Sequence, residues 1–238
     1  MPKIKAMILT ENFREALADY ILLLNKGYPH KNILELVATR YALNHFERSM
    51  LYRGITTMEK AERRKNKLIT IEQLNNGTLE LWNSGTLHID LFNVLYTLAA
   101  YLRGFPVFIS NDGLLRDASE SHGSGEWEVH LDKGLDLLLK SLENLKIMKA
   151  IIYIDNPMEH YEVILGKLKI LVNRLNPEIK IIADQSPDHL IREEKEGIIA
   201  TSDSTIIDKS TLPVFDLPRA LLESHFEPNF IRLDKLET

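Results

Sequence analysis

The chain has 238 residues, of which 45% are hydrophobic and 26% are charged, and its formal net charge is −5. This is enough for a substantial core in one large domain or two modest ones. The absence of cysteine excludes a disulfide framework, a thiolate zinc site and a cysteine nucleophile. The apolar stretch before Glu11 is too short for a signal peptide, and no later run approaches the length of a membrane span. We therefore expect a cytoplasmic protein with no membrane partner.

The charge is divided unevenly along the chain. Residues 1–67 hold thirteen Lys and Arg against seven Asp and Glu, whereas the remainder holds sixteen against twenty-seven. A basic part beside an acidic part would suit an enzyme that acts on a phosphate polymer. Ordinary surface charge without any partner explains the same numbers.

Residues 1–66 are predicted to form a small, basic, all-helical module. Apolar residues recur at helical spacing over 13–24 and again over 33–41. Asn44 and Glu47 have the spacing of a capping box that opens a third helix toward Gly54. The nucleic-acid-binding candidates of this part are arginines: Arg40, Arg48, Arg53, Arg63 and Arg64. A network of arginines with Glu47 that ties the helices together is an equally good interpretation.

Residues 67–86 are predicted to be a hairpin or linker, because two apolar runs, 69–74 and 78–82, flank Asn75-Asn-Gly77. From residue 87 to 238, short apolar runs alternate with helix-length amphipathic stretches. The predicted order is strand, helix 93–103, strand 106–110, irregular loop 111–129, helix 130–146, strand 150–154, helix 158–174, strand 179–183, helix 187–195, strand 197–201, helix, strand 213–216 and helix 218–225. This alternation predicts an α/β fold, a three-layer sandwich with a mainly parallel sheet.

Five of the apolar runs end in an acidic residue. These residues are Asp90, Asp112, Asp155, Asp184 and Asp203. Parallel sheets bind ligands at the carboxyl ends of their strands, so we expect the carboxylates to gather at one edge. Because clustered carboxylates repel one another, a hard cation such as Mg²⁺ or Mn²⁺ is the expected ligand. The alternative is that each Asp caps the helix that follows it.

In the metal-site hypothesis, Asp90, Asp155 and Asp203 hold one ion, and Asp112 or Asp208 completes a second position. Asn93, in the first turn after Asp90, would orient water or a phosphate oxygen, and Arg116 would stabilise developing negative charge.

His122 lies in a polar, glycine-containing stretch and is a candidate general acid or phosphate contact. A loop histidine bonded to a neighbouring carbonyl, and a local ion pair between Arg116 and Asp117, are the structural alternatives for this loop.

These motifs resemble those of the PIN-like nuclease superfamily and its NYN branch, with Asp90, Asn93, Thr201 and Asp203 as the matching residues. The chain also resembles an archaeal family filed as domain of unknown function (DUF) 434, with a PIN-like C-terminal half. That second resemblance covers most of 11–217 and includes Asn111-Asp-Gly113. The superfamily resemblance implies Mg²⁺- or Mn²⁺-dependent hydrolysis of phosphodiesters, usually in RNA, although no clear acid lies on the helix after the second strand.

The sequence therefore predicts a metal-dependent nuclease acting on RNA or single-stranded nucleic acid. The competing hypothesis is a non-catalytic nucleic-acid or nucleotide binder that keeps the fold.

Overall fold

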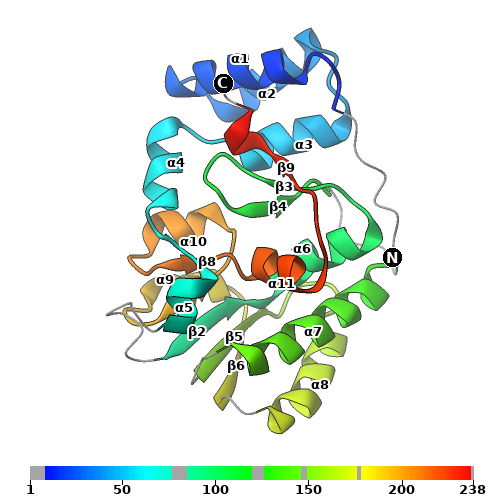
Figure 1. Ribbon diagram of the computed structural model, residues 1–238, viewed down its shortest axis with the longest axis vertical. Helices are drawn as coiled ribbons and strands as arrows, with labels where there is room; N and C mark the ends of the chain where they lie inside the picture. Colours follow the sequence, from blue (N-terminus) through cyan, green and yellow to red (C-terminus); the bar gives the residue numbers. More distant parts are fainter. Residues whose placement is uncertain (1–8, 77–84, 120–125, 146–148, 176–177, 237–238) are drawn as a thin grey trace. The chain divides into compact units, whose positions relative to one another are not determined.

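The computed structural model describes residues 9–76, 85–119, 126–145, 149–175 and 178–236. The chain forms two compact units, whose elements are labelled in Figure 1. Unit 1 comprises residues 1–66, 100–122 and 229–238, and unit 2 comprises residues 67–99 and 123–228. This differs from the sequence-based division into 1–66, 67–86 and 87–238, because two segments of the expected α/β domain pack with the N-terminal helices.

Unit 1 begins with helices, as predicted. They are α1 (Phe13–Asn25), α2 (His30–Arg40), α3 (His45–Gly54) and α4 (Met58–Lys65). The predicted capping box opens α3: Glu47 N donates to Asn44 Oδ1 and Asn44 N donates to Glu47 Oε2, both at 3.0 Å. The Glu47 carboxylate also accepts a bond from Thr10 N. Glu47 is thus used at the helix end, and no ion pair with an arginine is needed to explain its burial.

A three-stranded sheet completes unit 1. Its strands are β3 (Val107–Ile109), β4 (Leu115–Asp117) and β9 (Ile231–Arg232), in the order β4-β3-β9. Phe108 and Leu233 of this part pack in one core with Phe13, Tyr20 and Met50 of the helices. The prediction of strand 106–110 was right in kind but wrong in place, since β3 pairs with β4 and β9 and not with the parallel sheet. The loop expected over 111–129 contains β4 and the start of a helix.

Unit 2 is built on a six-stranded sheet in which every pairing is parallel. Its strands are β1 (Leu68–Ile69), β2 (Thr86–Asp90), β5 (Lys149–Asp155), β6 (Glu178–Asp184), β7 (Ile198–Ala200) and β8 (Val214–Phe215). The order across the sheet is β1-β8-β7-β2-β5-β6. The expected α/β architecture with a mainly parallel sheet is therefore present.

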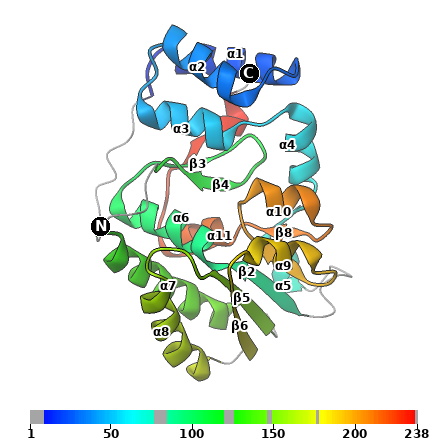
Figure 2. The ribbon, with the colours of Figure 1, turned by 180° about the vertical axis from the view of Figure 1, so that it is seen from behind.

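Helices cover both faces of this sheet, as Figures 1 and 2 show. They are α6 (Leu91–Arg103, whose last turn belongs to unit 1), α7 (Glu126–Asn144), α8 (Tyr161–Leu171, continued by the 3-10 turn Val172–Arg174), α9 (Pro187–Glu193), α10 (Ser204–Lys209) and α11 (Leu217–His225). One face buries Tyr153 and Ile199 against Ile191 of α9 and Ile206 of α10. The two helices that follow β6 and β7 therefore lie on the same face of the sheet.

The predicted hairpin over 69–82 is wrong in its first half. A short helix, α5 (Ile71–Asn76), occupies most of the expected strand. Thr70 and Gln73 bond reciprocally at its start, since Gln73 N donates to Thr70 Oγ1 and Thr70 N donates to Gln73 Oε1. This cap satisfies two backbone donors that a strand would pair elsewhere. Residues 78–82, the second half, lie outside the described residues.

Among the described residues, no helix is long and apolar enough to cross a membrane.

Candidate functional site

The acids predicted at strand ends lie largely at one edge of the sheet in unit 2. Asp90 ends β2, Asp155 ends β5 and Asp184 ends β6, and Asp155 and Asp184 are partners in register. Asp203 follows the end of β7 by three residues. Because all strands of this sheet run in the same direction, these residues share its carboxyl edge. Asp112, the fifth expected acid, belongs to unit 1.

The order of the strands reverses at β2. Along the chain, β5 and β6 are added on one side of β2, and β7 and β8 are then added on the other. In open parallel sheets, ligands bind outside the carboxyl ends of the two strands between which the order reverses. Here those strands are β2 and β7. The fold itself therefore selects Asp90 and the residues after Ala200 as the candidate site.

Hydrogen bonds join the residues at the ends of β2 and β7. Thr201 Oγ1 donates to Asp90 Oδ2 at 2.8 Å and accepts from Asp203 N at 3.0 Å. Asn93 Oδ1 accepts from both N and Oγ of Ser202, at 2.8 and 3.0 Å. Two donors on Oδ1 fix the orientation of the Asn93 amide, so its Nδ2 group is available to donate elsewhere. The structure thus brings together Asp90, Asn93, Thr201 and Asp203.

Asp203 is also a helix cap. Its Oδ1 accepts from Thr205 N at 2.6 Å and from Ile206 N at 3.1 Å, at the start of α10. The capping interpretation is confirmed for this residue. Its Oδ2 has no hydrogen-bond partner within the part of the chain that is described, so capping occupies only one of the two carboxylate oxygens.

Asp188 belongs to the same site and was missed by the sequence reasoning. It lies in the first turn of α9. Burial raises the pKa of Asp188, the charges of Asp203 and Asp155 raise it further, and Arg192 partly opposes this. Asp188 is therefore within electrostatic range of acids on two different strand ends. The available signal was an acid just inside a helix start, at Pro187-Asp188, shortly after the strand that ends at Asp184.

The electrostatics of the edge favour a cation. Burial raises the pKa of Asp90 to about 7, and Asp188 and Asp203 contribute to the rise, although the bond from Thr201 opposes it. Burial and the neighbouring Asp184 raise the pKa of Asp155 as well. Asp155 Oδ1 is buried and has no hydrogen-bond partner among the residues that the structure describes. These groups lack the positive charge that normally accompanies buried carboxylates.

The expected set of three metal-binding carboxylates is not formed. No group of three or more His, Asp or Glu side chains in the described ranges is close enough to hold one ion. Asp155 is on β5, one strand beyond the pair β2 and β7. Asp208 is in the last turn of α10, at the opposite end of that helix from Asp203. Any cation here would rest on fewer carboxylates, as Mg²⁺ often does when water and phosphate complete its shell.

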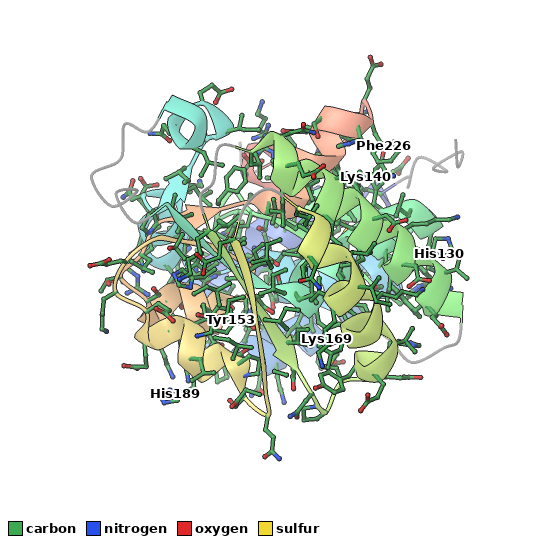
Figure 3. All side chains as sticks on the ribbon, turned by 90° about the horizontal axis from the view of Figure 1, so that it is seen from below. His130, Lys140, Tyr153, Lys169, His189 and Phe226 are labelled. Carbon is green, nitrogen blue, oxygen red and sulfur yellow. The ribbon has the colours of Figure 1, made fainter. Side chains whose placement is uncertain are left out.

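A buried polar chain anchors the far end of α9, the helix that carries Asp188. Tyr153 Oη donates to Glu194 Oε1 at 2.7 Å and lies 3.0 Å from His88 Nδ1. His88 Nε2 lies 3.0 Å from the carbonyl oxygen of Glu196. Figure 3 shows Tyr153 between the sheet and α9, with His189 of α9 directed outward. These bonds link β2 and β5 to the segment after α9 and so fix where that helix ends.

Asp112 and Arg116 have bonding partners inside unit 1. Within unit 1, Arg116 and Arg64 both bond to the buried Asp112 carboxylate, which is 1% exposed. Burial alone would raise the pKa of Asp112, but the charge of Arg116 and the hydrogen bonds from Arg116, Ser110 and Arg64 outweigh it and lower the pKa. The expected roles as metal ligand and as phosphate contact are replaced by a buried ion pair.

The motif around Asn111 is structural as well. Asn111 N donates to the Gly54 carbonyl. In the Asn111 side chain, Oδ1 accepts from Thr56 N and Nδ2 donates to the Thr56 carbonyl. Gly113, with φ +86°, closes the turn between β3 and β4. A Cβ on Gly54 would lie 2.4 Å from the ring of Phe108. These residues join α3 to the β3–β4 hairpin.

Most of the arginines proposed for nucleic acid are paired inside unit 1. Arg53 forms a two-point bond with Asp117, Arg48 bonds Glu35, and Arg40 lies 3.9 Å from Asp19. The alternative of an arginine network between helices is thus closer to the structure, with partners other than Glu47. Arg63 is exposed on α4. His122 lies outside the described residues, and its role stays a prediction.

The fold and the edge define an α/β protein with a candidate ligand site at the reversal point of a parallel sheet. The chain belongs to the family described as "Domain of unknown function (DUF5616)", whose model matches residues 79–220. A second model, described as "Protein of unknown function (DUF434)", matches residues 12–67. The expected DUF434 resemblance is thus confined to the N-terminal helices, and a different family model covers the sheet.

The chain is similar to an uncharacterized protein of the archaeon Methanocaldococcus jannaschii. The two are 26% identical over 213 residues, which is 89% of this chain and 97% of the relative. No solved structure matches the chain. The match spans residues of both units, and the name of the relative states no activity.

Proposed function

We propose that the chain is a Mg²⁺- or Mn²⁺-dependent phosphodiesterase, a PIN-like nuclease acting on RNA or single-stranded nucleic acid at the carboxyl edge of the sheet in unit 2. The observation that carries the proposal is the set of acids with raised pKa at the reversal point. Asp90, Asp155 and Asp188 are partly or fully desolvated, and none forms an ion pair with a described residue. Strongly perturbed carboxylates in such a position are typical of catalytic sites.

The residues fit a hard divalent cation through oxygen donors. Asp90 and Asp203 would hold it, Asp203 through the oxygen not used in capping, with Asp188 or Asp155 reaching it through water. When bound, the ion would supply an activated water and neutralise charge on the phosphate.

The other residues would position these groups. Thr201 holds Asp90 Oδ2, and the oriented Asn93 amide would donate from Nδ2 to a nonbridging phosphate oxygen. Arg116 has no part in this proposal because it is bound to Asp112.

A second candidate function is a nucleotide or nucleic-acid binder without hydrolysis. It is favoured by the finding that no three-carboxylate group is formed among the described residues.

Cleavage of end-labelled RNA and DNA with Mn²⁺, Mg²⁺ or EDTA tests the proposal. We expect metal-dependent cleavage by the wild type, a loss on the order of 10²–10³-fold or more for Asp90→Asn, and a loss of about 10²-fold for Asn93→Ala. Asp136→Asn, an exposed acid on α7 in the same unit, is the matched control and should cleave as the wild type does. Binding of the labelled RNA or DNA without cleavage in either metal would favour the second candidate.

A further inference from the structure

Four segments of unit 1 meet around the turn between α1 and α2. Asn25 Oδ1, at the end of α1, accepts from Met58 N at the start of α4, at 2.9 Å. His30, at the start of α2, has Nε2 3.2 Å from the Ile55 carbonyl and its ring centroid 4.9 Å from that of Tyr52 on α3. The residues next to these contacts therefore form one local surface. We call it the Tyr28–Tyr52 surface: Lys26, Tyr28, Lys31, Tyr52, Met58 and Lys60.

The surface exposes large apolar groups that the core of unit 1 does not use. Tyr28 is 55% exposed, Tyr52 43% and Met58 63%. The ring of His30 rests between Tyr52 and the fully buried Tyr20, so Tyr52 is supported from behind. A supported, exposed ring loses little conformational entropy when a ligand stacks on it.

The same surface carries uncommitted positive charge. Lys26, Lys31 and Lys60 are exposed, and within the described ranges none has an ion-pair partner. The arginines of unit 1 at positions 40, 48, 53 and 64 are paired. Burial lowers the pKa of His30, the hydrogen bond with Ile55 opposes this, and the positive charge of Lys60 lowers the pKa further. Glu59 is an exposed acid beside Lys60, so the three lysines leave the surface with a net positive charge.

We propose that the Tyr28–Tyr52 surface binds single-stranded nucleic acid, with bases stacked on Tyr28 and Tyr52 and backbone phosphates beside Lys26, Lys31 and Lys60. Exposed aromatic rings interleaved with unpaired cations are the usual means of binding single strands without reading sequence. Bases within a duplex are already stacked and cannot use the rings. The inference rests on the proposed function, since it supplies a polymer-binding surface for the nuclease, and it replaces the arginines as the contact residues.

Fluorescence anisotropy with the full chain in EDTA tests the surface separately from cleavage. The probe is a short labelled oligouridylate, compared with DNA of the matching sequence and with a duplex. We expect the single strands to bind more tightly than the duplex. Tyr28→Ala with Tyr52→Ala should weaken single-strand binding by about tenfold or more, and Tyr28→Phe with Tyr52→Phe should restore it.

The lysines should control the salt dependence. Replacing Lys26, Lys31 and Lys60 together by Gln should make the slope of log affinity against log salt less steep by about 2. The matched control replaces Lys133, Lys140 and Lys195, which are exposed in unit 2, and should leave the slope unchanged.

Wild-type affinity in the Tyr→Ala pair, an unchanged slope in the triple lysine variant, or no binding at low salt would each overturn the inference. Asp136→Asn in EDTA should bind as the wild type does. Binding that depends on the tyrosines, without cleavage in any metal, would reject the nuclease proposal and retain the binding surface. Cleavage that the tyrosine substitutions leave unchanged would retain the nuclease proposal and reject the binding surface.

Discussion

The two units use the same acidic residue type in opposite ways. In unit 1, Asp112 is buried between Arg64 and Arg116, and Asp117 is held by Arg53. In unit 2, Asp90 is held by a hydroxyl group and faces other acids. The pKa of Asp112 is therefore lowered, whereas the pKa of Asp90 is raised to about 7.

This difference separates residues that hold the fold from residues that cost it stability. A buried carboxylate that bonds two guanidinium groups fixes the turn that carries it, because separating the pair would leave a buried charge uncompensated. A carboxylate desolvated among like charges makes folding less favourable, and such arrangements persist mainly where a ligand relieves them. The Asn111-Asp-Gly113 motif of the family resemblance is thus structural, and the candidate chemistry lies in unit 2.

Matched substitutions of Asp112 and Asp90 should show the difference between the two units most clearly. Asp112→Asn leaves two buried guanidinium groups without their counter-charge, and we expect a loss of about 3–5 kcal/mol in the free energy of unfolding. Asp90→Asn removes a carboxylate that is already unfavourable, and we expect no loss in EDTA. Urea unfolding near neutral pH measures both. Equal destabilisation by the two changes would mean that Asp90 is structural.

The two carboxylates also predict opposite dependences on pH. Asp90 has a folded pKa of about 7 against an ordinary value of 3.8, so folding takes up a proton between these values. The stability of the wild type should fall, relative to Asp90→Asn, as the pH rises from about 4 to about 7 and then stay constant. Asp112, whose folded pKa is lowered, stabilises the fold above its ordinary value, and that stabilisation is lost as the pH falls through the folded pKa.

Thermal unfolding in EDTA between about pH 4 and about pH 7 measures the Asp90 effect, and the same measurement continued below pH 4 measures the Asp112 effect. If the difference between wild type and Asp90→Asn does not change between about pH 4 and about pH 7, then the Asp90 pKa is not raised and the contrast between the units disappears.

A cation should stabilise unit 2 through the unpaired acids. At a Mn²⁺ concentration one hundred times its dissociation constant, binding to the folded chain alone contributes about 2.7 kcal/mol. We expect a corresponding rise in the melting temperature of the wild type and of Asp136→Asn, and little or none for Asp90→Asn. A rise of equal size in Asp90→Asn would place any ion elsewhere in the protein.

Much of unit 2 was predictable because its apolar runs and helical stretches alternate regularly. The strands ending at Asp90, Asp155, Asp184 and near Asp203 are where the pattern put them. Asp188 was not predictable as a strand-end acid, since its position depends on α9 packing on the face shared with α10.

Unit 1 shows why other predictions from the sequence were wrong. A three-residue strand such as β3 fits either sheet. The run ending at Asp112 has the same local pattern as the strands of the parallel sheet that end in an acidic residue. What decides its place is a bond to Arg64, 48 residues earlier, which no local pattern records. At the expected hairpin the Asn-Gly signal was preferred, although Thr70 and Gln73 already had the spacing of a helix cap.

The smallest expected effect concerns Asp203. This residue has a structural role as the cap of α10 and a proposed role as a metal ligand. Its Oδ1 caps α10, so Asp203→Ala should cost about 1 kcal/mol in EDTA through the loss of two backbone bonds. Asn caps helices as well as Asp does, so Asp203→Asn should keep the stability of the wild type in EDTA. If the second oxygen binds a cation, Asp203→Asn should nevertheless reduce stabilisation by Mn²⁺, because an amide is a weaker ligand for a hard ion than a carboxylate. Melting temperatures with EDTA and with Mn²⁺ separate the two roles: an Asn variant that responds to Mn²⁺ as fully as the wild type would leave Asp203 as a cap alone.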